Sequence, residues 1–301
     1  MVESSSQSPD PVETEQLLAQ INEQLAQGRF DSTDSQLLQR MTEALADGRG
    51  MIRLGLVEAF GEIGKPAAPF LLEALAHHPN PVVRRSAAKG LAKIDEPQAI
   101  PTLIDAMLKD EDTVVRGSAA GALSRRGAAA APALLEIIAG DYSKTAKGQA
   151  IWAVASIGAE ATEQLYEAFK SDQVEVRTAV VGAIANIASS SENQDEGFEQ
   201  VIVSALQDEA VEVRLEAVTA LSQFPSQFAL PNLLPLLDDP NPELIRTAVL
   251  SLGKLGDSAA LPYLQGKLAD ERVGIPQVTK IAISQISHQV ENLPVKEGNR
   301  E

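Results

Sequence analysis

The stretch VVRRSAAKGL, residues 82–91, recurs along the chain as TVVRGSAAGAL at 113–123 and as VEVRLEAVTAL at 211–221. In each copy, small or aliphatic residues follow the arginine at three, four and seven places, which is the spacing of one stripe on an α-helix. Alignment of the copies puts these basic residues in one column: Arg53, Arg84, Arg116, Lys147, Arg177 and Arg214. Successive residues of this column are 30 to 32 residues apart, with one interval of 37, so the chain is built from an internal repeat.

The apolar stripe is the most regular part of the repeat. Its members are Leu56, Val57 and Phe60; Ala87, Ala88 and Leu91; Ala119, Ala120 and Leu123; Val180, Val181 and Ile184; and Ala217, Val218 and Leu221. Six places after the arginine column the residue is always small: Ala59, Gly90, Ala122, Ala153, Ala183 and Ala220. A small side chain there lets a neighbouring helix approach. In the block PELIRTAVLSLGKLG, residues 242–256, Ile245 takes the place of the arginine.

A second helix signature precedes each stripe. It starts with a proline column made of Pro69, Pro101, Pro132, Pro231 and Pro262, with Glu163 and Gln200 as replacements in two repeats. Proline is tolerated in a first helical turn, where its missing N–H has no partner in any case. Each repeat is therefore predicted to be a pair of helices, with Asn80 and Asp112 as N-caps of the second helix. No single pair can bury its apolar face, but stacking buries all of them.

These signatures also predict the domain organisation. We expect one continuous array over residues 12–290, with a capping helix at 12–27, seven clear repeats and a degenerate eighth at 257–290. The polar run ASSSENQDEG at 188–197 accounts for the long interval and is predicted to be a loop insertion. Residues 1–11 and 291–301 are predicted to be disordered.

Composition excludes several classes of protein. The net charge is −17 and the pI about 4.6, so the chain should repel nucleic acids and anionic membranes at long range. There is no cysteine, which excludes disulfides, thiolate metal sites and a cysteine nucleophile. The sequence shows no signal peptide and no apolar run long enough to span a bilayer, and we expect a cytoplasmic protein.

The recurring arginine is predicted to be structural. An arginine near the start of the second helix of a repeat can bond acidic turn residues of its own or an adjacent repeat. The residues assigned to this ladder are Arg53, Arg84, Arg116, Arg177 and Arg214 with Asp110, Asp112, Asp172 and Asp208. Such a ladder would disfavour slipped stacking of the repeats.

No catalytic or cofactor-binding motif stands out in the sequence. The chain has neither a glycine-rich phosphate loop nor a GxSxG or HExxH motif, and its histidines are His77, His78 and His288. Adjacent carboxylates such as Asp238 and Asp239 are explained by turns and helix capping. We therefore predict no catalytic residue, no metal site and no cofactor.

The exposed face of the second helices is the candidate functional surface. Places one, five and nine after the arginine column point away from the core, toward what would be the concave side of a solenoid. The residues predicted to form a docking patch there are Arg85, Lys89, Lys93, Arg125, Arg126 and Trp152, the last being the only tryptophan of the chain. Arg and Trp are favoured interface anchors. The alternative is a solvated face, with Trp152 folded over a neighbouring helix.

The repeat IPTLIDAMLKDEDTVVRGSAAGAL, residues 100–123, closely resembles the short HEAT-like repeats named after phycobilisome lyases. The resemblance covers roughly residues 34–286 and implies an all-α fold, a right-handed α-solenoid (superhelix) of HEAT-like two-helix repeats. Members include the E and F subunits of phycocyanobilin lyases, a phycobilisome-degradation adaptor and a HEAT protein linked to iron–sulfur homeostasis, all cyanobacterial. Deoxyhypusine hydroxylase has similar repeats, but its His-Glu pairs are missing here.

What the resemblance implies about function is docking of a protein partner. The first hypothesis is a non-catalytic scaffold that holds a phycobiliprotein, phycocyanin or allophycocyanin, on its concave face during phycobilisome assembly, stability or turnover. The second is a subunit of a bilin lyase, whose acceptor cysteine would lie on the substrate protein. The third is an adaptor in iron–sulfur homeostasis.

Overall fold

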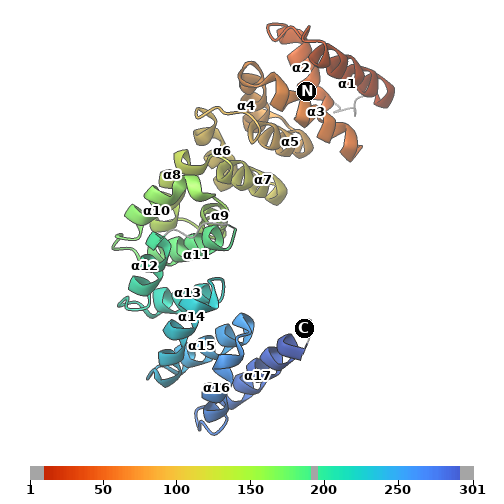
Figure 1. The fold of residues 1–301 in the computed structure, drawn as a ribbon. Helices are drawn as coiled ribbons and strands as arrows, with labels where there is room; N and C mark the ends of the chain where they lie inside the picture. Colours follow the sequence, from red (N-terminus) through yellow and green to blue (C-terminus); the bar gives the residue numbers. More distant parts are fainter. Residues whose placement is uncertain (1–9, 191–195, 292–301) are drawn as a thin grey trace. The chain divides into compact units, whose positions relative to one another are not determined.

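A computed structural model describes residues 10–190 and 196–291 of the chain (Figure 1). Within these residues the fold is all-helical, and none of them belongs to a β-strand. The helices divide into two compact units, Met1–Ala161 and Thr162–Glu301, which are called unit 1 and unit 2 and described separately. The predicted disordered ends lie outside the described residues, apart from Asp10, Pro11 and Glu291.

Unit 1 starts with the capping helix α1 (Pro11–Ala26), which the carboxylate of Asp10 caps by accepting from the N–H groups of Val12 and Glu13. Four pairs of helices follow: α2 (Ser35–Ala44) and α3 (Gly50–Ile63), α4 (Ala68–His77) and α5 (Pro81–Leu91), α6 (Ala99–Lys109) and α7 (Thr113–Ser124), α8 (Ala131–Ala139) and α9 (Lys144–Ala155). Short 3-10 turns at Lys65–Ala67, Gly127–Ala129 and Ala159–Ala161 join successive pairs.

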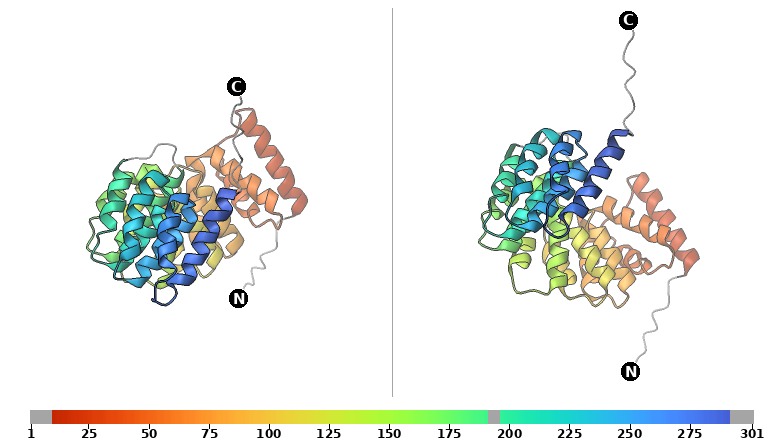
Figure 2. Two further views of the ribbon diagram at one scale, coloured as in Figure 1. Left: turned by 60° about the horizontal axis from the view of Figure 1, so that its bottom comes forward. Right: turned by 90° about the horizontal axis from the view of Figure 1, so that it is seen from below.

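Unit 2 contains four further pairs. They are α10 (Thr162–Ala168) and α11 (Val174–Ser190), α12 (Glu196–Ala205) and α13 (Val211–Leu221), α14 (Ser226–Leu233) and α15 (Pro242–Leu255), α16 (Leu261–Lys267) and α17 (Ile275–Glu291). Two 3-10 segments, Leu234–Asp238 and Ser258–Ala260, follow α14 and precede α16. In Figure 2, α17, in dark blue, lies beside α15, and the two helices contact each other along their length.

The predicted stripe forms the core of both units. Each of its fifteen residues from Leu56 to Leu221 is at most 4% exposed, because the stripe faces the partner helix and the stacked neighbours. The small residue at the sixth place allows close approach, and at Gly90 a Cβ atom would lie only 2.9 Å from Cδ1 of Leu71 on α4. Since the core is continuous from one pair to the next within each unit, the fold is an α-solenoid of two-helix repeats.

Two local expectations were wrong. Residues 188–190 are the last residues of α11 and residues 196–197 begin α12, so the predicted loop at 188–197 is shorter than expected, and residues 191–195 lie outside the described part. Pro231 lies inside α14 rather than in its first turn, because that helix already begins at Ser226. Its missing N–H leaves α14 short, and the chain continues as a 3-10 segment from Leu234.

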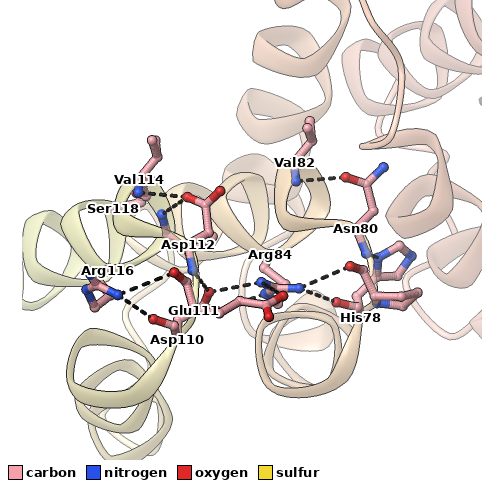
Figure 3. Close-up of polar contacts among 12 residues, drawn as sticks. His78, Asn80, Val82, Arg84, Asp110, Glu111, Asp112, Val114, Arg116 and Ser118 are labelled. Carbon is pink, nitrogen blue, oxygen red and sulfur yellow. Dashed lines mark hydrogen bonds and ion pairs between the residues drawn. The ribbon is translucent and has the colours of Figure 1, made fainter.

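Arg84 on α5 joins two consecutive repeats of unit 1 (Figure 3). Its Nε and Nη2 donate to the two carboxylate oxygens of Asp110, in the turn of the next repeat, at 2.8 and 2.9 Å. Its Nη1 donates to the backbone carbonyl of His78 at 3.0 Å. Both side chains of the ion pair are almost fully buried. The hydrogen bonds to Asp110 raise the pKa of Arg84, which stays charged.

The same contacts recur at other arginines of the column. In unit 2, Arg177 binds both carboxylate oxygens of Asp208 at 2.8 and 2.9 Å, and its Nη1 donates to the carbonyl of Ser171 at 2.8 Å. Asp172, beside Ser171, acts on Arg177 through its charge. A bond from the guanidinium to the carbonyl six residues earlier is also made by three further arginines: Arg53 to Asp47, Arg116 to Asp110 and Arg214 to Asp208. We call this set the arginine ladder.

The caps of the second helices lie next to the ladder. The side chain of Asn80 accepts from Val82 N, and the carboxylate of Asp112 accepts from Val114 N and Val115 N (Figure 3). Asp110 Oδ1 also accepts from Asp112 N at 2.9 Å, so one aspartate orders the turn and binds the arginine of the preceding repeat.

The arginine ladder makes the stability of unit 2 dependent on pH. The hydrogen bond from Arg177 holds the pKa of Asp208 below its usual range. The stabilisation from this pair is therefore complete above the unfolded-state pKa of about 4 and is lost as the pH falls through the lowered folded-state pKa. We expect Asp208→Asn to reduce stability at pH 7 and to flatten its decline between about pH 5 and pH 2. The test is to measure the urea unfolding midpoint of both proteins at several pH values across this range. If the midpoint falls equally steeply with pH in both proteins, the prediction is wrong.

Candidate functional site

The second helices of unit 1 present one continuous surface. The first, fifth and ninth places after the arginine column, on α3, α5, α7 and α9 or directly after their last turns, are exposed or half-buried, and we call this surface the second-helix face. Its residues are Leu54, Glu58, Glu62, Arg85, Lys89, Lys93, Gly117, Gly121, Arg125, Gly148, Trp152 and Ser156. In unit 1, α5 and α7 contact each other more extensively than α4 and α6 do, so the unit curves toward this face.

Three cations of the second-helix face have no polar partner. The side chains of Arg85, Lys89 and Arg125 make no hydrogen bond or ion pair within residues 10–190 and 196–291. Arg85 and Lys89 lie one turn apart on α5, and Arg125 follows the last residue of α7. These three side chains are therefore available to a ligand.

The two other predicted cations are engaged inside the unit. Lys93 Nζ lies 2.9 Å from Glu58 Oε2 on α3. The guanidinium of Arg126 turns back to donate to the carbonyl of Leu91, at the C-terminal end of α5, where the helix dipole favours a positive charge. Arg126 Nε is buried without a hydrogen-bond partner, and burial lowers the pKa of this side chain. Both residues act as links between repeats.

Trp152 on α9 is 54% exposed. Its ring lies over α7, with Cη2 3.9 Å from the position that a Cβ atom on Gly121 would occupy. The alternative prediction, a tryptophan folded over a neighbouring helix, describes this contact, yet more than half of the side chain still faces solvent.

Two glycines near Trp152 leave positions of the second-helix face without side chains. A Cβ atom added at Gly117 on α7 or at Gly148 on α9 would meet no atom within 4 Å. The corresponding places on α3 and α5 carry Leu54 and Arg85. The helix backbones of α7 and α9 are thus more accessible than those of α3 and α5.

In the described part of unit 1, a larger and a smaller hollow lie beside the second-helix face. The larger, of about 1000 Å³, lies where α3, α5, α7 and α9 end, and its charged lining consists of Glu58, Glu62, Lys93, Asp95, Arg125, Arg126 and Glu160. The smaller, of about 210 Å³, includes Arg85 and Lys89 beside Leu54 and Val57. The six predicted patch residues therefore fall in three places: the larger hollow, the smaller hollow and Trp152 between α7 and α9.

Sequence reasoning missed the acidic part of the larger hollow. Glu58 and Glu62 occupy the same places after the arginine column as Lys89 and Lys93 do in the next repeat, so the repeat alignment contained a signal for them. Asp95 lies in the loop after α5, and Glu160 lies in the 3-10 turn after α9, so the repeat alignment carries no such signal for them. With four carboxylates against three cations, this hollow is not basic as a whole.

The described residues give no indication of a metal centre or of a bilayer-spanning helix. Among residues 10–190 and 196–291, no three His, Cys, Asp or Glu side chains are grouped so that they could hold a metal ion. His78 lies 3.3 Å from Glu43 and accepts from Asn80 N through Nδ1, a contact within the fold. None of the described helices is long and apolar enough to cross a membrane.

The repeats match the family model of HEAT repeats over residues 35–124, 68–145 and 199–283. The chain belongs to the HEAT-repeat proteins. A relative from Synechococcus sp. (strain WH8020), the bilin biosynthesis protein MpeU, is 33% identical over 258 residues, which cover 85% of this chain and 86% of MpeU. The predicted resemblance to HEAT-like repeats of the phycobilisome-lyase type is thus confirmed.

Two solved structures are similar to the chain at low identity. The CpcE–CpcF complex of phycocyanin lyase from Nostoc sp. PCC7120 is 19% identical, with 62% of this chain and 99% of that chain covered and a TM-score of 0.31. Human deoxyhypusine hydroxylase is 18% identical, with 92% of this chain and 98% of that chain covered and a TM-score of 0.37.

Proposed function

We propose that this HEAT-repeat protein is a scaffold that holds a phycobiliprotein, phycocyanin or allophycocyanin, on the second-helix face of unit 1 during phycobilisome assembly, stability or turnover. The observation that carries the proposal is the 33% identity to a bilin biosynthesis protein along nearly the whole of both chains. The exposed Trp152 and the unpaired Arg85 and Arg125 support it, because Trp and Arg are favoured anchors of protein interfaces.

A binding assay with purified partners tests the scaffold. The full-length chain is immobilised and offered separated subunits of phycocyanin and allophycocyanin, each with and without its bilin. We expect retention of at least one subunit, and weaker retention by Trp152→Ala because the exposed ring is lost. If no subunit is retained above an unrelated HEAT-repeat protein, the proposal is wrong.

The second candidate function is a bilin lyase subunit. The relative's role in bilin biosynthesis favours it, and so does the larger hollow, whose volume of about 1000 Å³ is in the range of small-molecule sites. Since the chain has no cysteine, the thiol that accepts the bilin would belong to the phycobiliprotein.

A chromophore-transfer assay separates the two functions. Bilin and an apo-phycobiliprotein subunit are incubated with and without the chain, alone and together with an F-type lyase subunit. A lyase subunit gives chain-dependent visible absorbance that survives denaturation of the acceptor. Equal absorbance with and without the chain rejects the lyase function and leaves the scaffold unaffected.

A further inference from the structure

The unpaired cations contrast with the charge of the whole chain. The protein has 42 acidic and 25 basic residues, yet Arg85 and Lys89 on α5 and Arg125 at the end of α7 have no carboxylate partner among the residues that the structure describes. The nearby Glu58 is already engaged by Lys93. A partner that places carboxylates next to these three side chains would be attracted electrostatically, because no carboxylate of the described residues already neutralises them.

The second-helix face also restricts the backbone conformation of its occupant. The part of the face that carries Trp152 and the three unpaired cations is made of the sides of α5, α7 and α9, whose backbone N–H and C=O groups are bonded within their own helices. An extended segment lying there would have to bond its amides to side chains of the face or to water, because no main-chain group is open to it, and every buried amide left unpaired is costly. An α-helix satisfies its backbone internally and needs only side-chain contacts from the face.

The shape of the second-helix face around Trp152 leaves room for a partner helix. The open positions at Gly117 and Gly148 leave a low strip over α7 and α9, with Trp152 beside it. The cations lie along the α5 side and at the end of α7. The helices α5 and α9 are two helix spacings of about 8–10 Å apart, so a partner helix that lies across α5, α7 and α9 reaches from the cations on α5 to Trp152 along its own length.

We propose that the second-helix face of unit 1 binds an acidic α-helix of the partner protein, with carboxylates against Arg85, Lys89 and Arg125 and one side of the helix against Trp152. This inference rests on the proposed function in that both use the same face, and it specifies the surface that the partner must present. Lys93 and Arg126, which are engaged within unit 1, are not part of this contact.

Trp152 reports on binding directly because it is the only tryptophan. The full-length chain is titrated with a labelled helical peptide of about 20 residues that has glutamates on one face and leucine and alanine on the other, and no tryptophan. We expect a change in Trp152 emission and a rise in peptide anisotropy at the same concentrations. The affinity should fall as salt rises, because the contact is between exposed charges.

Charge reversal identifies the contact residues. The triple variant Arg85→Glu, Lys89→Glu and Arg125→Glu is expected to weaken peptide binding by about tenfold or more. The matched control reverses three exposed cations of unit 1 outside the face, Arg29→Glu, Lys65→Glu and Lys144→Glu, and changes the net charge equally. It should retain most of the affinity. Equal loss in both variants would mean that overall charge, not this surface, attracts the peptide.

A second pair of changes tests the geometry. Gly117→Leu and Gly148→Leu place side chains in open space, so the fold should persist while peptide affinity decreases severalfold. Circular dichroism checks that helix content is retained. A peptide of the same composition with central prolines should bind much more weakly, and equal binding would overturn a helical occupant in favour of an extended one.

The outcomes distinguish this inference from the proposed function. Binding of the acidic helix without retention of any phycobiliprotein leaves the inference intact and rejects the proposed function. Retention of a phycobiliprotein equally by the wild type and the Arg85, Lys89 and Arg125 triple variant rejects the inference alone. Absence of any peptide binding to the wild type also rejects it.

Discussion

Replacing Arg84 by alanine is expected to lower the free energy of unfolding by roughly 3 kcal/mol. The change removes two hydrogen bonds to Asp110 and leaves its carboxylate, 7% exposed, buried without its counter-charge. It also removes the donor to the His78 carbonyl. Breaking one partner of a buried ion pair is costly because desolvation of the other is no longer offset. Urea unfolding followed by far-UV circular dichroism measures the loss.

An exposed ion pair of the same unit is the control. Lys109 and Asp105 form an ion pair on the surface of α6, with both side chains more than half exposed. Lys109→Ala should change stability little, because solvent screens such pairs. If Arg84→Ala and Lys109→Ala have the same effect, the arginine ladder does not hold the repeats together.

The replacement Gly253→Val is expected to lower the free energy of unfolding by roughly 2 kcal/mol. Gly253 lies on α15, and an added Cβ atom would stand 2.9 Å from both Cα and Cβ of Ala282 on α17. A backbone atom cannot move aside as a side chain can, so α15 and α17 would have to separate. The same urea titration measures this loss of stability. If the valine variant is as stable as the wild type, α15 and α17 can separate without cost and the prediction is wrong.

The matched control is Gly148→Ala, a glycine replacement at an uncrowded helix position, which is expected to raise stability and not to lower it. Gly148 lies inside α9, and a Cβ atom there meets nothing within 4 Å. Alanine should therefore raise the free energy of unfolding by about 0.5–1 kcal/mol through its higher helix propensity. A loss of stability here would show that the site is more crowded than the structure indicates.

The repeat and its core could be predicted because their signal is periodic. Positions three, four and seven places after the arginine column face one side of any α-helix, so residues such as Phe60 and Leu91 are buried. The same reasoning placed Lys89 and Trp152 on the exposed side. N-caps such as Asp112 were predictable for the same reason, since capping is a local interaction between a side chain and nearby N–H groups.

Helix boundaries were less predictable. Pro231 occupies the proline column, yet α14 begins five residues earlier, at Ser226. The polar residues after Ala188 read as a loop, but Ser189 and Ser190 continue α11. At α11 the helix is longer than the local sequence suggests, because serine weakens a helix only modestly at its end and packing of the apolar face outweighs it. At α14 the helix starts earlier than suggested, so the proline lies in its interior, where the missing N–H removes a helical hydrogen bond.

The sequence by itself determined the two-helix repeat, the buried stripe and the set of side chains on the second-helix face, because helical periodicity is a property of consecutive residues. Only the tertiary structure decided which cations of that face are free. Lys93 meets Glu58 on the preceding repeat, and Arg126 reaches Leu91, 35 residues away. Such pairs depend on how far one helix is shifted and rotated against the next, and that offset results from packing across the stack, which no single repeat encodes.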